Sequence, residues 1–337
     1  MAYFGITATE AGLEPARPGV DLESELARGL AGVSRKAPVV VLIHGYKFHP
    51  GLPDADPHRS LFAFRPEEAS WKIRSWPEGL GFADDGGETG LCIGFAWPAS
   101  TGHLASLVTT GRNGFARVYD RAGDYGARLA ELLALLQKLA PGRPVDLMAH
   151  SLGARVALAA LPALAVAPRR VILLGAAEFG DRALDFLAAA PALRPPSIYN
   201  VTTRANDLFD AMLEQFAPRR SRRERAVGQG LGDDGLVNWL DLQFDRPDVT
   251  AWINARGIPL IPGQRRLCHW SFYTRDGALG VYQAILRRRR GWDIASLKSA
   301  PCFAGQEPRW SRLVPGRRID LPGLGNDLRP PLGLEGA

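Results

Sequence analysis

The sequence is poor in cysteine, and its few cysteines form no motif. The 337 residues include three, Cys92, Cys268 and Cys302, which are odd in number, far apart and without C-x-x-C spacing. A disulfide scaffold and a zinc site are therefore not indicated. This cysteine usage is typical of a reducing compartment and predicts a cytoplasmic location.

Long apolar runs and leader-like features are also lacking. The opening residues, MAYFGITATEAGLEP, contain no basic stretch followed by an apolar core, so we expect no secretory leader. No later stretch approaches the roughly 20 apolar residues that a membrane-spanning helix needs. We therefore expect no transmembrane segment.

Sequence motifs for bound cofactors are missing as well. The chain has neither a P-loop nor a G-x-G-x-x-G after a strand, and no cluster of His, Cys, Asp or Glu has the spacing of metal ligands. We therefore expect no cofactor and no metal ion.

The chain carries a modest excess of positive charge, with a formal net charge of +6. Much of this excess lies in two arginine clusters, one bounded by Arg219 and Arg225 and the other by Arg287 and Arg290. Such runs are usually solvated, and the second closes a predicted helix, where cations are favoured. We expect no nucleic-acid partner, and only a weak contact between these clusters and an anionic surface.

Short apolar runs alternate with segments of helical periodicity. The apolar runs are residues 38–46, 91–97, 145–149, 170–176 and 197–203. A run that is apolar on both faces is typical of a strand inside a parallel sheet covered by helices. Because strands that alternate with helices form βαβ units, we predict one α/β domain over residues 1–337, with a mostly parallel central sheet and helices on both faces.

Two stretches depart from this rhythm. Residues 204–264 lose clear periodicity, and we expect them to form an irregular cap or insertion, with residues 258–261 as the candidate for a last strand. Residues 48–90 form a long connection rich in Pro, Gly and Asp with scattered aromatic residues. Such a connection either covers the mouth of a site or packs its aromatic side chains onto the body.

Ser151 lies at the joint between an apolar strand and a segment of small, helix-favouring residues. The local pattern Ala149-His150-Ser151-Leu152-Gly153 matches the nucleophile elbow G-x-S-x-G, with alanine in place of the first glycine. Small residues flank the serine in this motif because the sharp strand-to-helix turn brings neighbouring backbone close. Ser151 is therefore the candidate nucleophile.

A serine nucleophile needs a general base, and histidine is the side chain with a suitable pKa. The chain has six histidines. His269 alone follows both Ser151 and a candidate acid, which is the order serine, acid, histidine that this architecture produces. His269 is therefore the candidate base.

The third member of a catalytic triad orients the imidazole through its other nitrogen. It should follow a strand beyond the elbow, and Asp207, just after residues 197–203, fits this position best. Glu178, which follows residues 170–176, and Asp210 remain alternatives.

Backbone N–H groups are expected to hold the oxyanion that forms during attack on a carbonyl. One donor is the residue after the nucleophile, Leu152, and the other lies in the loop after residues 38–46. Tyr46 is the first candidate in that loop and Lys47 the second.

The motifs taken together resemble those of the α/β-hydrolase superfamily. The segments VLIHGY, FAWPA, VYDRAGDY, MAHSLGARV and IYNVTTRANDLFD look like those of a group of poorly characterised bacterial serine α/β hydrolases, over residues 38–290. The resemblance implies an α/β-hydrolase fold and esterase-like or lipase-like chemistry. A serine, rather than an aspartate, at the elbow favours esters, thioesters or amides over carbon–halogen bonds and epoxides.

The sequence therefore predicts a serine hydrolase that cleaves small-molecule carboxylic esters through an acyl-enzyme intermediate. A thioesterase or amidase of the same mechanism is the nearest alternative. A second alternative is a catalytically silent scaffold that binds anionic partners through its arginine clusters.

Overall fold

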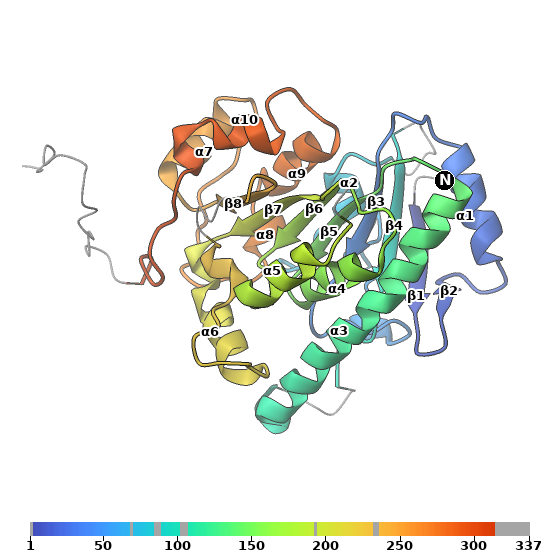
Figure 1. Ribbon diagram of the computed structural model, residues 1–337, viewed down its shortest axis with the longest axis horizontal. Coiled ribbons are helices and arrows are strands. Elements are labelled where there is room, and N and C mark those ends of the chain that lie inside the picture. The colour runs from blue at the N-terminus through green and yellow to red at the C-terminus, as the bar shows by residue number, and fades with distance from the viewer. Residues whose placement is uncertain are drawn as a thin grey trace, which may run out of the picture.

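A central sheet organises the protein. The computed structural model describes residues 3–67, 70–83, 89–101, 107–191, 194–231 and 236–313. Within these residues, eight strands form one sheet in the order β2-β1-β4-β3-β5-β6-β7-β8 (Figure 1). The strands are β1 (Tyr3–Ala8), β2 (Leu13–Pro15), β3 (Val39–Ile43), β4 (Leu91–Ala96), β5 (Asp146–His150), β6 (Arg170–Leu174), β7 (Ser197–Thr202) and β8 (Trp239–Gln243).

The sheet is mostly parallel, as predicted. Only the pairing of β1 with β2 is antiparallel among the described strands, and every other neighbouring pair runs in the same direction. Parallel strands need helical crossovers, and the helices of this chain supply them. The prediction of an α/β fold is thereby confirmed.

Strand β3 illustrates why these residues form a buried strand. Its sequence VVVLI is fully buried, and β-branched side chains favour the extended backbone. Successive side chains point to opposite faces, so Val39, Val41 and Ile43 join one apolar core, whereas Val40 and Leu42 join a second. The sheet is therefore covered on both sides.

Helices form the layers that cover these two faces. Along the chain they are α1 (Leu22–Ala31), α2 (Trp76–Gly79), α3 (Leu107–Leu139), α4 (Leu152–Ala160), α5 (Gly180–Ala188), α6 (Asp207–Phe216), α7 (Pro247–Asn254), α8 (Ser271–Thr274), α9 (Ala278–Leu286) and α10 (Ile294–Lys298). Short 3₁₀ turns are η1 (Pro53–Ala55), η2 (Leu161–Ala163), η3 (Arg204–Asn206), η4 (Val227–Gln229) and η5 (Pro301–Phe303). The first core takes buried side chains from α1, α3, α4, α5 and α6, and the second from α2, α7, α8, α9 and α10.

The last strand lies earlier in the chain than expected. Residues 258–261 do not form a strand, and the edge strand is β8, which pairs with β7. Proline at 259 cannot donate to a strand neighbour, and the Leu260 N–H donates to the Asn254 side chain at 2.7 Å. Strand β8 lies inside residues 204–264, so this part of the expected cap belongs to the sheet, while a capping role for the remainder stays a prediction.

The long connection at residues 48–90 divides its aromatic side chains between two environments. Phe62 and Trp76 are fully buried in the second core, whereas Trp71 is 47% exposed. Packing onto the body therefore explains the first two, and Trp71 is left at the surface beside the candidate site described below.

Candidate active site

The candidate nucleophile, Ser151, lies in the turn between β5 and α4. Ser151 has a φ of 55° and a ψ of −125°, a left-handed backbone conformation that a non-glycine residue adopts at a cost of about 1–3 kcal/mol. Its N–H donates to the Leu174 carbonyl at 3.0 Å, which ties the turn to β6. A Cβ atom on Gly153 would lie 2.5 Å from the His44 carbonyl oxygen, so only glycine lets α4 approach the end of β3 this closely.

The loop after β3 lies directly against Ser151. A Cβ atom on Gly45 would lie 2.6 Å from the Ser151 Cβ, which requires glycine at this position. Two hydrogen bonds between His44 and Trp97 hold the start of this loop. The His44 Nε2 accepts from the Trp97 backbone N–H at 3.0 Å, and the Trp97 indole N–H donates to the His44 carbonyl at 3.0 Å. Burial lowers the pKa of His44 to about 3, so this imidazole is a neutral structural group.

The backbone N–H groups of Tyr46 and Lys47, the two candidate oxyanion donors in this loop, differ in whether they already have a hydrogen-bond acceptor. The Lys47 N–H donates to the Ala99 carbonyl at 2.9 Å and is therefore already engaged. No acceptor for the Tyr46 N–H occurs within the described part of the chain. The Leu152 N–H is in the first turn of α4, where backbone donors have no partner inside the helix. This arrangement favours Tyr46 and Leu152 over Lys47.

The structure brings His269 to Ser151. The His269 Nε2 lies 2.9 Å from the Ser151 Oγ, although 118 residues separate them. His269 precedes α8, and the Cys268 N–H donates to the Ala205 carbonyl at 2.9 Å, which ties this segment to the end of β7. The ring of Phe209 stacks on the imidazole with a centroid distance of 4.6 Å. The imidazole is therefore held in one place by backbone and ring contacts.

The partner of the other imidazole nitrogen is Asn206, which the sequence analysis did not consider. The His269 Nδ1 lies 2.7 Å from the Asn206 Oδ1, so Nδ1–H donates and Nε2 is left to accept from the serine hydroxyl. Asn206 is the last residue of η3, a turn that begins where the Thr203 side chain accepts from the Ala205 N–H. An asparagine in this position orients imidazole without adding charge.

Asp207, the expected triad acid, points elsewhere. Its carboxylate accepts from the Trp310 N–H at 2.6 Å and pairs with Arg204 at 3.4 Å. One residue along a helical turn rotates the side chain by about 100°, which takes Asp207 away from the imidazole that Asn206 reaches. In this structure Asp207 therefore does not take the orienting position, and its burial raises its pKa.

The two alternative acids also occupy other positions. Glu178 is fully buried and accepts from Tyr119, from Arg155 at 2.5 Å and from the Phe179 N–H at 2.7 Å, a network remote from His269. Asp210 accepts from the Asn206 Nδ2 at 2.9 Å. Asp210 is therefore one step removed from the imidazole.

A second histidine supports the first. The His150 Nε2 lies 3.0 Å from the His269 carbonyl oxygen, and the two rings are 4.6 Å apart. Burial lowers the pKa of His150 to about 4, so it donates as a neutral ring. Burial is the main reason why the pKa of His269 lies well below its usual 6.5, and the nearby His150 lowers this pKa further. The His269 imidazole is therefore unprotonated at neutral pH.

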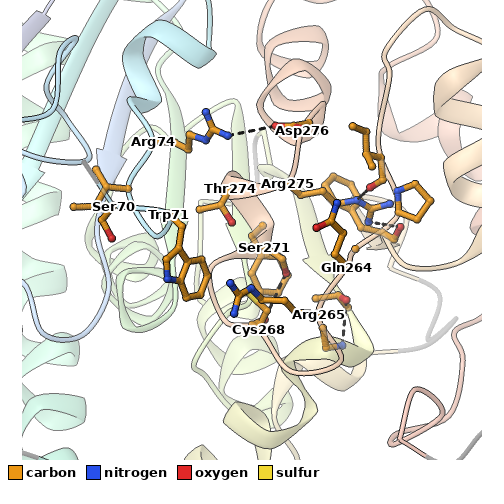
Figure 2. Close-up of a pocket in the computed structure, with 18 of the residues that line it drawn as sticks. Ser70, Trp71, Arg74, Gln264, Arg265, Cys268, Ser271, Thr274, Arg275 and Asp276 are labelled. Atoms are coloured by element: carbon orange, nitrogen blue, oxygen red, sulfur yellow. Dashed lines mark hydrogen bonds and ion pairs between the residues drawn. The ribbon is translucent and has the colours of Figure 1, made fainter. Parts of the chain in front are cut away.

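A cavity of about 780 Å³ adjoins the segment that carries His269 (Figure 2). Thr203 and Ala205 line it from the end of β7, and Cys268 and Ser271 line it from either side of His269 in the sequence. Ligands of open parallel sheets bind beyond the carboxyl ends of the strands, where this cavity lies.

Arginine side chains dominate the charge of this cavity. Arg74 pairs with Asp276 at 3.4 Å, as Figure 2 shows, whereas Arg265 lies over the Trp71 ring at 3.9 Å. Arg275 donates to backbone carbonyls and to a threonine, and burial lowers its pKa to about 10. Within the described residues, neither Arg265 nor Arg275 has a carboxylate within 4 Å.

Some arginines of the two clusters form ion pairs or hydrogen bonds with neighbouring residues. Arg220 pairs with Asp185, and Arg219 lies 3.9 Å from Glu214. Arg287 donates to the backbone carbonyls of Leu80, Gly81 and Thr89. These three arginines therefore hold surface segments together.

The described residues show neither a metal-ligand cluster nor a membrane-spanning helix. They contain no group of three or more His, Cys, Asp or Glu side chains placed to hold a metal ion. None of the helices described is both long and apolar enough to cross a membrane.

Comparison with known proteins adds a family match for part of the chain. Residues 87–180 match the sequence model of a family described as "Protein of unknown function (DUF726)", which is α/β-hydrolase-like. The matched segment includes Ser151 and the elbow but ends before Asn206 and His269. No curated protein matches the chain.

Proposed function

We propose that this protein is a serine hydrolase that cleaves carboxylic esters through an acyl-enzyme intermediate. The observation that carries the proposal is the 2.9 Å contact between the Ser151 Oγ and the His269 Nε2, at a strained elbow. A nucleophile and a base within hydrogen-bonding reach, with the base oriented by a third group, are the signature of covalent catalysis. Thioesters and amides would follow the same steps.

In this mechanism, the Ser151 Oγ attacks the carbonyl carbon of the ester while His269 Nε2 accepts the hydroxyl proton. The Tyr46 and Leu152 N–H groups hold the negative oxygen, and removing one such donor costs about 3–4 kcal/mol of barrier stabilisation. The carbon–oxygen bond then breaks, and His269 returns the proton to the leaving alcohol. Water, deprotonated by His269, releases the acid and restores Ser151.

A fluorophosphonate probe tests this proposal, because it forms a covalent bond only with an activated serine. We expect the wild-type protein to be labelled at pH 8 and Ser151→Ala to lose all labelling. Ser271→Ala, which removes a hydroxyl from the adjoining cavity, is the control and should be labelled as the wild type is. No labelling of the wild type would favour the alternative of a silent scaffold that binds anionic partners.

The arginine-lined cavity indicates which esters the protein prefers. A guanidinium without a carboxylate partner attracts an anion, and a charge-assisted hydrogen bond contributes about 1.5–3 kcal/mol. Cys268 and Ser271, on either side of His269 in the sequence, line the cavity, whereas Ser151 and His269 themselves do not. We infer from this proximity that the cavity receives one part of an ester whose carbonyl lies at Ser151. We therefore expect esters that carry an acidic group to be preferred.

Two p-nitrophenyl esters with five-carbon acyl chains test this preference. The glutarate monoester should be hydrolysed with a kcat/KM about 10–100-fold above that of the neutral valerate ester, the ratio that one charge-assisted contact produces. Arg265→Gln should remove most of this preference. Arg256→Gln is a matched control, because Arg256 also stacks on a tryptophan, Trp252, but does not line the cavity. Equal rates for the two esters would contradict the preference while leaving the serine mechanism intact.

A further inference from the structure

A chain of four side chains leads inward from the nucleophile. Ser151 contacts His269 at 2.9 Å, His269 contacts Asn206 at 2.7 Å, and Asn206 contacts Asp210 at 2.9 Å. Asp210 is 2% exposed and lies four residues after Asn206, one turn further along α6. The mechanism described above uses the first three of these side chains and leaves Asp210 without a role.

Asparagine can point either end of its amide at the imidazole, and the two choices have opposite consequences. With Oδ1 toward His269, the Nδ1–H tautomer is favoured and Nε2 can accept the Ser151 proton. With Nδ2 toward His269, the ring nitrogen that faces it must accept, so Nε2 carries the proton and cannot act as a base. The amide orientation therefore decides whether the serine can be activated.

Asp210 selects the productive orientation. A carboxylate only accepts hydrogen bonds, so it must face the Nδ2 end of Asn206, which leaves Oδ1 for His269. Its other oxygen accepts from the Gln229 Nε2 at 2.7 Å. A Cβ atom on Gly228 would lie 2.6 Å from both carboxylate oxygens, so the glycine makes room for the carboxylate.

We propose that Asp210 is a positioning residue for the reaction: its ionised carboxylate fixes the Asn206 amide and, through it, the Nδ1–H tautomer of His269. The inference rests on the proposed function, because the tautomer matters only where His269 serves as a base. In this inference, the neutral side chain of Asn206 contacts the His269 imidazole. The buried carboxylate of Asp210 sets the orientation of the Asn206 amide.

The charged groups around Asp210 make this control pH-dependent. Burial raises the pKa of Asp210, Arg204 opposes the rise, Asp207 adds to it, and Gln229 and Arg309 oppose it, so that the pKa is about 7. The next acid along α6, Glu214, is paired with Arg309 at 2.8 Å. Above about pH 7 both carboxylate oxygens accept from amide N–H groups. Below it one oxygen carries a proton, so one of the two amides loses its acceptor.

The expected pH profile therefore has two steps on its acid side. As the pH falls through about 7, Asp210 takes up a proton and kcat/KM falls partially, because the Asn206 orientation is no longer enforced. A second, complete loss follows at lower pH, where His269 itself is protonated, since its pKa lies well below 6.5. A structural role for Asp210 would give only the second step.

Asp210→Asn tests the inference with little change in shape. An amide offers one acceptor and one donor where the carboxylate offers two acceptors, so one neighbouring amide must turn. We expect kcat/KM at pH 8 to fall about 10–100-fold, as for partners one step removed from a reacting group, with KM little changed and the step near pH 7 absent. Glu214→Gln, a second buried acid on α6 with no contact to Asn206, is the control and should retain both steps.

Nuclear magnetic resonance of ¹⁵N-labelled histidine reads the tautomer without using activity. Wild-type His269 should carry its proton on Nδ1 at pH 8 and change toward a mixture with a midpoint near pH 7, whereas Asp210→Asn should be mixed at both pH values. An unchanged Nδ1–H tautomer in Asp210→Asn would overturn the inference even if the protein hydrolyses esters. Absence of fluorophosphonate labelling in the wild type would instead contradict the proposed function.

Discussion

Replacing His269 by alanine is expected to lower the rate of ester hydrolysis at pH 8 on the order of a million-fold. The imidazole Nε2 is 2.9 Å from the Ser151 Oγ, and the hydroxyl has no other base within reach among the described residues. Without a base, the serine stays protonated near neutral pH and is a poor nucleophile. Combining His269→Ala with Ser151→Ala should cost little more than either change alone, since the two side chains act as a unit.

The matched control for this prediction is His49→Ala. His49 is partly buried and its Nδ1 lies 2.8 Å from the Pro50 carbonyl oxygen, in the connection that precedes Ser151. We expect its rate to stay within about threefold of the wild-type rate. Thermal melting of both variants separates loss of chemistry from loss of fold. A His269→Ala protein that keeps a normal melting temperature and hydrolyses esters at the wild-type rate would contradict the assignment of the base.

Several features of the sheet and the elbow follow from local sequence. A short β-branched run such as VVVLI is typical of a strand covered on both faces, so the parallel sheet was predictable from the sequence pattern. The serine between two small residues predicted a strained turn, and the structure has Ser151 at a φ of 55°. Chain order was enough to choose His269 from six histidines, since only one followed the elbow.

The hydrogen-bond partner of the His269 Nδ1, Asn206, could not be predicted from local sequence. Choosing between Asn206 and Asp207 requires knowing where η3 ends and α6 begins, and one residue of error turns the side chain by about 100°. Besides nearby Arg204, Asp207 is held by the Trp310 N–H, from a residue 103 positions away. Local pattern cannot reveal contacts of that sequence separation. A preference for carboxylates in triads favoured the neighbouring aspartate.

The edge strand and His150 were missed for related reasons. Strand β8 has an acidic residue at its centre, Asp241, which accepts from the Asn200 side chain on β7 and so pairs across the sheet. Alternation alone did not single out this segment. His150 is the last residue of β5, next to Ser151, and its role depends on a hydrogen bond to the carbonyl of a residue 119 positions later. The only feature of the sequence that points to His150 is its place inside the elbow motif.

Asn206→Ala is the second change with a large expected effect. Without the Asn206 Oδ1, nothing among the described residues accepts from the His269 Nδ1–H, and the Nε2–H tautomer, which cannot accept the serine proton, becomes populated. Removing the orienting aspartate of a serine triad lowers kcat on the order of 10⁴-fold. We expect a loss of about 10³–10⁴-fold in kcat with little change in KM, measured by hydrolysis of a p-nitrophenyl ester at pH 8.

Asn206→Asp separates the effect of orientation from that of charge. An aspartate would still accept from Nδ1–H, so activity at pH 8 should be retained to within about tenfold. Its negative charge favours the imidazolium and raises the pKa of His269, so the acid side of the kcat/KM profile should move to higher pH than in the wild type. The new carboxylate would also face Asp210, which Asn206 contacts at 2.9 Å, and two such carboxylates share one proton near neutral pH. If Asn206→Ala lost less than tenfold and Asn206→Asp left the profile unmoved, the 2.7 Å contact would be packing alone, and His269 would be oriented by Phe209 and His150.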